Sequence, residues 1–227
     1  MHKEITTMGQ IRGVILDIDG TLIDSNDAHA HAWVQAMADN GYDVPFEEVR
    51  PLIGMGGDKV LPEILGLQKD SENGQQISKR RKEIFKERYL PTIQPFPGAK
   101  ELLRRMRERG LKLAVASSAE EDELKSLLHI LDATDLIAEK TSSSDAQHSK
   151  PDPQPVEVTL KRIGLPPAAV VMLGDTAYDI EAAQKVGVRT IALRCGGWSD
   201  KDLSGAIAIY DDPADLLARY ETSVLAG

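Results

Sequence analysis

Short apolar runs alternate with stretches of helical periodicity along most of the chain. The runs 14–16, 111–116, 170–173 and 189–193 consist largely of aliphatic and β-branched residues, a composition typical of buried strands. The segments between them place apolar residues at helical spacing, which is typical of amphipathic helices. This alternation predicts an α/β fold built on a doubly wound, mostly parallel, Rossmann-like sheet. We expect two further edge strands over 135–138 and 207–210.

The segment 26–92 departs from the alternation because it contains helical patterns and no strand pattern. We expect helices over 25–40, 45–49, 59–65 and 77–89. The chain therefore divides into an α/β core domain, from residues 1–25 and 93–227, and an inserted all-helical domain, residues 26–92. The stretch around Ser25 and the proline-bearing segment Pro91–Pro97 are the expected hinges between them.

Composition limits the class of partner. The chain has 227 residues, of which 41% are hydrophobic, and a net charge of −9. The acidic balance argues against a nucleic-acid-binding surface, and we interpret the basic run Lys79–Lys82 as a solvated helix face. No apolar stretch approaches the roughly 20 residues that a membrane helix needs. We expect no nucleic-acid partner and no membrane association.

The remaining composition adds three expectations. The segment Met1–Gln10 has no apolar run of the signal-peptide type, so we expect a cytoplasmic protein. Cys195 is the only cysteine, which excludes an intrachain disulfide and a thiolate metal cluster, and we interpret it as a small, partly buried hydrophobic residue. We expect a monomer or a weak homodimer.

Candidate chemistry begins where the first predicted strand ends. Asp17 and Asp19 follow the apolar run 14–16, and Gly20 then bends the chain. Open α/β sheets bind ligands at the carboxyl ends of their strands. Two carboxylates this close together repel each other unless a cation or a shared proton compensates. Because hard oxygen ligands favour Mg²⁺, the pair predicts a magnesium site.

Polar residues follow other predicted strands as well. Ser117 and Ser118 end the run 111–116 and precede a predicted helix, where backbone N–H groups favour anions. Lys150 is followed by a proline and should lie in a loop. Asp175 ends the run 170–173, and Asp179 lies one helical turn further on.

These clusters together resemble a known family. Asp17-Ile18-Asp19-Gly20-Thr21-Leu22 is similar to the signature of the haloacid dehalogenase superfamily of aspartyl-phosphate hydrolases. Ser117, Lys150 before Pro151, and Gly174-Asp175-Thr176-Ala177-Tyr178-Asp179 resemble its second, third and fourth motifs, in the same order. The helical insert between the first two motifs resembles the subfamily with a helical cap. Asp24-Ser25, His29 and Trp33 resemble phosphoglycolate phosphatases and β-phosphoglucomutase-like enzymes.

The resemblance implies a role for each matching residue. Asp17 would attack phosphorus to form an aspartyl-phosphate, and Asp19 would protonate the leaving oxygen and later deprotonate water. Mg²⁺ would be bound by the carboxylates of Asp17 and Asp175 and by the backbone carbonyl of Asp19. Ser117 would hold phosphate oxygens, together with neighbouring backbone N–H groups. The two remaining residues would act on charge and orientation, Lys150 by offsetting negative charge and Asp179 by orienting Lys150 or a bound water.

Substrate contacts are expected from the loops around this site. The candidates are Ser118, His29, Gly20, Arg50 and Lys59. His29 lies near the acidic loop and could touch a substrate, although a solvated or capped histidine fits the pattern equally well. Arg50 and Lys59 flank the glycine-rich stretch 53–57, which does not match P-loop spacing. We interpret this stretch as a helix–loop–helix hinge that brings both cations toward the site.

The reaction class follows from what the resemblance implies for single positions. Asp19 favours phosphate monoester hydrolysis, because dehalogenases of the superfamily lack this second aspartate. The segment 25–29 lacks the lysine of phosphonate hydrolases, and Gly54–Gly57 lacks the arginine by which the mutases bind a second phosphate. We therefore expect a Mg²⁺-dependent phosphatase that acts on a small phosphorylated metabolite of the phosphoglycolate or sugar phosphate type. The alternatives are a β-phosphoglucomutase-like phosphosugar mutase and a catalytically idle phosphometabolite-binding protein.

Overall fold

A six-stranded, fully parallel sheet lies at the centre of the computed structural model, which describes residues 10–226. The strand order is β3-β2-β1-β4-β5-β6, so β1 lies in the middle of the sheet. The strands are β1 (Gly13–Leu16), β2 (Lys112–Ala116), β3 (Glu139–Thr141), β4 (Val170–Gly174), β5 (Arg189–Leu193) and β6 (Ala208–Tyr210). The order reverses direction at β1, and parallel sheets bind ligands at the carboxyl ends of strands beside such a switch point.

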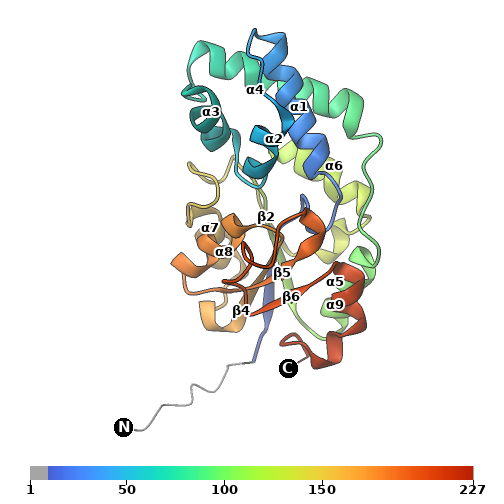
Figure 1. Cartoon of the computed structure of the whole chain (residues 1–227). Helices are drawn as coiled ribbons and strands as arrows, with labels where there is room; N and C mark the ends of the chain where they lie inside the picture. The colour runs from blue at the N-terminus through green and yellow to red at the C-terminus, as the bar shows by residue number, and fades with distance from the viewer. Residues whose placement is uncertain (1–9, 227) are drawn as a thin grey trace.

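Helices cover both faces of the sheet (Figure 1). One face packs against α5 (Ala99–Glu108), α6 (Glu121–Ile130) and α9 (Pro213–Ala218), and the other against α7 (Gln154–Ile163) and α8 (Ala177–Lys185). Successive strand residues point to opposite faces: Val14 and Leu16 join the first cluster, whereas Ile15 joins the second. This arrangement confirms the predicted doubly wound α/β fold.

A helical layer lies over the carboxyl ends of the strands (Figure 1). It contains α1 (Asn26–Asp39), α2 (Phe46–Val49), α3 (Gly57–Leu65) and α4 (Glu72–Ile84), which continues into a π-helical turn (Phe85–Tyr89). The layer has its own buried side chains, among them Trp33 and Met37 of α1 and Ile77 of α4. Every helix within residues 10–226 is too short or too polar to span a bilayer.

The two chain segments that connect this layer to the sheet run side by side. The Asp24 N–H donates to the Gln94 carbonyl at 3.0 Å, and the Phe96 N–H donates to the Leu22 carbonyl at 3.0 Å. Ile23 and Pro95 form an isolated antiparallel bridge between these two contacts. Two adjacent, hydrogen-bonded segments therefore join the helical layer to the sheet.

Two predicted elements differ from the structure. Residues 135–138 are not a strand: a short 3-10 turn covers Thr134–Leu136, and β3 follows at Glu139–Thr141. β3 is an edge strand paired only with β2, so polar side chains are tolerated where the prediction required apolar ones. Helix α4 begins at Glu72 rather than 77, because the Ser71 side chain caps it by accepting from the Gly74 N–H at 3.2 Å. The first nine residues of the predicted core domain lie outside the described residues.

Candidate active site

Asp17 lies directly after β1 and is held by contacts on both carboxylate oxygens. Its N–H donates to the Leu173 carbonyl at 2.9 Å, which continues the pairing of β1 with β4. The ammonium group of Lys150 contacts Oδ1, and the Thr21 hydroxyl lies 3.0 Å from Oδ2. Lys150 also donates to Asp179 Oδ1 at 2.6 Å and is only 1% exposed. Burial alone would lower the pKa of Lys150, but Asp17 and Asp179 raise it by more. The net pKa lies above its usual value, so the ammonium is charged.

Asp175 and Asp179 come from the end of β4 and the first turn of α8. Asp175 Oδ1 lies 2.8 Å from the Thr21 hydroxyl, and its Oδ2 accepts from Asn26 Nδ2 at 2.9 Å. Asp179 forms a capping box with Thr176, whose N–H donates to the Asp179 carboxylate at 3.1 Å. The helix cap fixes the Asp179 side chain and leaves its second oxygen for Lys150.

Two glycines allow the backbone to approach Asp175 closely. A Cβ atom on Gly20 would lie 2.4 Å from Asp175 Oδ2, and one on Gly196 would lie 1.8 Å from the same atom. Gly20 also has a φ of +75°, a conformation that costs other residues energy. Gly20 therefore shapes the site through its backbone, and it does not line the cavity described below.

The three buried carboxylates Asp17, Asp175 and Asp179 fit a hard divalent cation. Their oxygens lie within 4.8 Å of one another, and Lys150 supplies one positive charge among them. Burial raises the pKa of Asp17 to about 7 despite Lys150. Burial, reinforced by Asp17 and Asp179, raises the pKa of Asp175 well above its usual range. The buried Oδ1 of Asn26 has no partner among the described residues. These all-oxygen donors suit Mg²⁺.

Asp19 points away from this cluster and toward the helical layer. Its Oδ1 accepts from the Ser25 hydroxyl at 2.6 Å and lies 2.8 Å from His29 Nε2. On the other side of the ring, His29 Nδ1 lies 2.6 Å from Arg81 Nη2. Arginine can only donate, so Nδ1 accepts and Nε2 carries the hydrogen given to Asp19. Burial favours the neutral form of Asp19, but His29 and Ser25 outweigh it and hold its pKa below the usual range.

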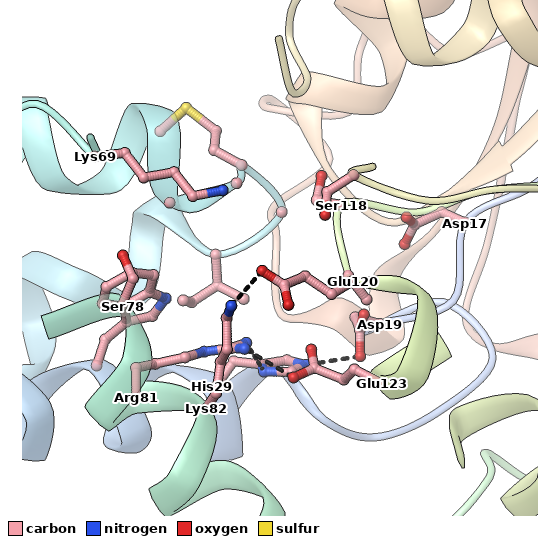
Figure 2. A pocket seen from close by; sticks show the side chains of 18 residues that line it. Asp17, Asp19, His29, Lys69, Ser78, Arg81, Lys82, Ser118, Glu120 and Glu123 are labelled. Atoms are coloured by element: carbon pink, nitrogen blue, oxygen red, sulfur yellow. Dashed lines mark hydrogen bonds and ion pairs between the residues drawn. The ribbon is translucent and has the colours of Figure 1, made fainter. Parts of the chain in front are cut away.

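Arg81 and Lys82 connect the helical layer to the core through ion pairs. Arg81 Nη1 donates to Glu123 Oε2 of α6 at 2.8 Å, and Lys82 pairs with Glu120. The His29 ring stacks on Phe85 with the ring centroids 4.1 Å apart. Figure 2 shows this charged chain, Asp19–His29–Arg81–Glu123, along one side of a pocket. The chain links the loop after β1 to α1, α4 and α6, so the helical layer is docked on the core at this point.

A cavity of about 80 Å³ lies between the core and the helical layer. Asp17, Asp19 and Ser118 line it from the core, and Trp33, Ser78 and Arg81 line it from the helical layer. Lys69 and Ser118 also line an adjoining hollow, together with Ser117. Asp17 and Asp19 therefore line one and the same cavity.

The two serines after β2 lie in different environments. The Ser117 hydroxyl accepts from the Ala119 N–H at 3.0 Å, and its side chain is buried. The Ser118 hydroxyl lines the cavity and has no hydrogen-bond partner among the described residues. The Ser118 hydroxyl is thus unpaired, whereas the Ser117 hydroxyl holds the turn that precedes α6.

Like Gly20, two further predicted substrate contacts, Arg50 and Lys59, do not line the cavity. Arg50 donates to Asp27 at 2.6 Å and to the Gly196 carbonyl at 2.7 Å, so its guanidinium is used within the structure. Lys59 lines a separate hollow and lies 3.9 Å from Asp58. The glycine-rich stretch does reach the cavity through Gly54 and Gly56, but its flanking cations do not.

The interpretation of Lys79–Lys82 as a solvated helix face is wrong at Arg81, whose side chain is 15% exposed, whereas the side chain of Lys82 is 44% exposed. Arg81 and Lys82 line the cavity, because α4 packs beside α1 and above α6 and so turns this face inward. Sequence reasoning also missed several residues of the site: Thr21, Asn26, Lys69, Ser78, Glu120 and Glu123. Thr21 and Asn26 follow the acidic motif closely and could have been found there. The remaining four residues lie in no sequence motif that indicates a role in the site.

Comparison with known proteins agrees with this geometry. Residues 14–193 match the model of the family described as haloacid dehalogenase-like hydrolase. The phosphoglycolate phosphatase of Aquifex aeolicus is 31% identical over 223 residues, which cover 95% of this chain and 99% of that protein. The N-acetylmuramic acid 6-phosphate phosphatase of Pseudomonas aeruginosa is 27% identical, covering 92% and 94%.

A solved structure extends the likeness to the fold. A hydrolase from Pseudomonas syringae superposes with a TM-score of 0.86 at 28% identity, over 93% of this chain and 98% of that one. The family match spans β1 to β5 and therefore includes both Asp17 and Asp175. The chain belongs to the haloacid dehalogenase-like hydrolase family, as its four ordered motifs indicated.

Proposed function

We propose that this protein is a Mg²⁺-dependent phosphatase that hydrolyses a small phosphate monoester through an aspartyl-phosphate on Asp17. One observation carries the proposal. Asp17 and Asp19 line the same cavity, while Asp17 is paired with Lys150 and adjacent to Asp175. A nucleophile, an acid–base group and a charge-neutralising cluster are what phosphoryl transfer requires.

Asp17 is suited to the nucleophilic step. Its carboxylate is oriented from both sides, by Lys150 on Oδ1 and by Thr21 on Oδ2, so little reorganisation is needed before attack. When an Asp17 oxygen bonds to phosphorus, the bond from phosphorus to the leaving oxygen breaks. Lys150 offsets the negative charge that the phosphoryl group brings into this buried position.

Asp19 is suited to move protons on the leaving-group side. Protonated Asp19 gives its proton to the leaving oxygen, and the resulting carboxylate then takes a proton from the water that hydrolyses the aspartyl-phosphate. A phosphate dianion next to Asp19 raises its pKa, since a second negative charge disfavours the ionised form. The hydrogen bond from His29 keeps the carboxylate directed into the cavity.

When bound, Mg²⁺ would be held by the carboxylates of Asp17 and Asp175 and the backbone carbonyl of Asp19, and would neutralise charge on the transferring phosphoryl group. Asp179 orients Lys150 from the α8 cap. Ser118, with its free hydroxyl, and Ser117, which shapes the turn, are proposed to hold phosphate oxygens.

Residues 26–92 are proposed to act as a cap domain on a core of residues 1–25 and 93–227. The adjacent connections at Asp24 and Gln94 form the pivot, and the charged chain docks the cap in the closed position. Closure excludes water from the aspartyl-phosphate until hydrolysis. The two curated relatives named above are a phosphoglycolate phosphatase and a phosphosugar phosphatase, which supports a small phosphorylated metabolite as substrate.

The proposal is tested by phosphate release from a panel of phosphorylated metabolites, with Mg²⁺ or with excess chelator, beside the Asp17→Asn variant. We expect release that depends on the metal and disappears in the variant. Equal release with chelator, or from Asp17→Asn, would contradict the proposal. No release from any compound, including the activated substrate acetyl phosphate, would favour a binding protein instead.

A further inference from the structure

Ser149, which immediately precedes Lys150, is bound by the helical layer through three hydrogen bonds. Its N–H donates to Asp58 Oδ2 at 3.1 Å, and its hydroxyl donates to Asp58 Oδ1 at 2.6 Å. The Gly56 N–H in turn donates to the Ser149 hydroxyl at 2.9 Å. Asp58 belongs to the first turn of α3, which Figure 1 shows above the loop that leads to α7. The helical layer therefore binds the core one residue before Lys150.

Two glycines of the glycine-rich stretch make this close docking possible. A Cβ atom on Gly56 would lie 2.8 Å from Ser149 Cβ, and one on Gly54 would lie 2.7 Å from Thr176 Cγ2. Gly54 also has a φ of +111°, a conformation that favours glycine. Thr176 belongs to the capping box that orients the second carboxylate partner of Lys150. The stretch thus contacts the core at two points beside Lys150, the chain before it and the cap of its partner.

Ser149 is held more weakly from the core side. Its carbonyl accepts from the Asp152 N–H at 3.0 Å, whereas within residues 10–226 its N–H and its hydroxyl donate only to Asp58. Ser149 is 8% exposed, and buried donors normally have partners. Movement of the helical layer away from the core would remove the partner of both donors. The backbone conformation just before Lys150 therefore depends on whether the helical layer is docked.

The placement of Lys150 matters for the chemistry. Its ammonium group is buried, contacts Asp17, and donates to Asp179 Oδ1 at 2.6 Å. Electrostatic stabilisation in a buried site requires groups that are already in place when the charge develops, and a misplacement of about 1 Å can lower a rate about 100-fold. Because the peptide bond between Ser149 and Lys150 is planar and stiff, a displacement of Ser149 is passed on to Lys150.

We propose that Asp58 is a positioning residue that couples docking of the helical layer to the placement of Lys150, and that it acts through Ser149. The inference rests on the proposed function. With the layer docked, Asp58 orders Ser149, and Lys150 is in place when phosphorus is attacked. With the layer open, Lys150 is less well placed and the aspartyl-phosphate forms slowly. Asp58 does not line the cavity that contains Asp17, so it acts on the lysine and not on the substrate.

The rate constant of aspartyl-phosphate formation tests this coupling. In Asp19→Asn with Mg²⁺ and acetyl phosphate, hydrolysis is slowed and the intermediate accumulates, so its amplitude gives the folded, active fraction. We expect Asp58→Ala to lower the maximal rate constant at least about tenfold. The acetyl phosphate concentration that gives half this maximum should change less than about twofold, because the lost interaction is one of the transition state. Asp58→Asn keeps one acceptor oxygen and should give an intermediate rate constant.

A matched aspartate of the helical layer is the control. The side chains of Asp39 and Asp58 are 30% and 24% exposed, but Asp39 accepts from Arg80 within the layer. Asp39→Ala should change the maximal rate constant less than about twofold. Ser149→Ala removes the hydroxyl that Asp58 binds, so adding Asp58→Ala to it should lower the rate constant by at most about a further threefold.

Hydrogen exchange gives a readout that does not depend on activity. Mass spectrometry of the segment 146–152 follows the amide of Ser149. Asp58→Ala should speed exchange in this segment, because it removes the acceptor of the Ser149 N–H. Asp39→Ala should leave the exchange unchanged.

The outcomes separate this inference from the proposed function. If the aspartyl-phosphate forms, three results would each overturn the inference alone: an unchanged maximal rate constant in Asp58→Ala, an equal loss in Asp39→Ala, or full additivity with Ser149→Ala. A loss confined to the half-saturating concentration would also overturn it, because Asp58 would then only dock the layer. Absence of the aspartyl-phosphate and of any turnover would overturn both proposals. A non-additive loss specific to Asp58, with faster exchange in 146–152, would support the coupling.

Discussion

The core side and the cap side of the cavity arrange their charges in opposite ways. On the core side, Asp17, Asp175 and Asp179 share the single positive charge of Lys150, so negative charge is in excess. On the cap side, Arg81 and Lys82 each have a glutamate partner. Excess buried charge is costly unless a ligand compensates it. The difference supports the proposal that the core side of the cavity binds a cation and carries the chemistry.

The largest expected effect on activity comes from replacing Asp17, on the core side of the cavity. Asp17→Asn keeps the size of the side chain but removes the nucleophile, so kcat should fall by roughly 10⁴-fold or more. Steady-state phosphate release measures this. Asp43→Asn, a matched change at an exposed position of the cap, should retain normal activity. A modest loss at Asp17, equal to that at Asp43, would refute the nucleophile assignment.

Asp19 lies where the two sides meet, and its loss should depend on the leaving group. Asp19→Asn removes the proton donor, and kcat for an alkyl phosphate should fall by about 10³-fold. For an activated substrate such as acetyl phosphate, formation of the aspartyl-phosphate needs no proton donor, and only its hydrolysis should slow. Rapid-quench kinetics with both substrates separates the two steps. Equal slowing of aspartyl-phosphate formation with both would argue against an acid role.

The excess of negative charge on the core side should make the free energy of unfolding depend on pH and on bound metal. The pKa of Asp17 is raised from 3.8 to about 7 in the folded, metal-free protein. Protonated Asp17 therefore contributes fully to the free energy of unfolding below pH 4. This contribution, up to about 4 kcal/mol, is lost as pH rises toward 7. Asp175, whose pKa is also raised, acts in the same direction.

Thermal unfolding at pH 5 and pH 8, with and without Mg²⁺, measures this dependence. We expect Mg²⁺ to raise Tm more at pH 8, where the carboxylates are ionised and protons no longer compete with the metal. Asp175→Asn should raise the metal-free Tm and abolish the increase caused by Mg²⁺. A Mg²⁺ effect that is larger at pH 5 would contradict the charge distribution described here.

The smallest expected effect distinguishes two lysines of the helical layer. Lys69 lines the cavity and Lys59 does not. Lys69→Ala should raise KM about threefold to fivefold, in keeping with the modest value of an exposed charge, whereas Lys59→Ala should leave KM unchanged within about twofold. Initial-rate measurements with one substrate decide the matter. A larger effect at Lys59 would restore the role that its sequence position first indicated.

The sequence was informative wherever the chemistry lies at strand ends. The apolar runs before Asp17, Ser117 and Asp175 fix these residues at the carboxyl edge of one parallel sheet. Because adjacent parallel strands end at the same edge, the sequence order of the motifs was enough to place them together. The edge strand β3 was misplaced since its polar residues carry no burial pattern.

The cap side could not be predicted because its contacts depend on how helices pack. The pairing of Arg81 with His29 and Glu123 joins three helices, and which face of α4 turns inward is set by packing on α1. A run of four basic residues, Lys79–Lys82, gives no indication of which members will line the cavity. Arg50 and Lys59 were favoured by proximity in sequence to the glycine-rich stretch, but their side chains point elsewhere.

Chemical trapping of the intermediate tests the central claim most directly. Asp19→Asn incubated with Mg²⁺ and acetyl phosphate should accumulate the aspartyl-phosphate, because formation proceeds while hydrolysis slows. Borohydride reduces an acyl phosphate to the alcohol, which converts the modified aspartate to homoserine, and peptide mass spectrometry locates it. The account predicts homoserine at position 17 only when Mg²⁺ and acetyl phosphate are both present, and none in the Asp17→Asn, Asp19→Asn double variant. Turnover without modification of residue 17, or modification at another carboxylate, would contradict it.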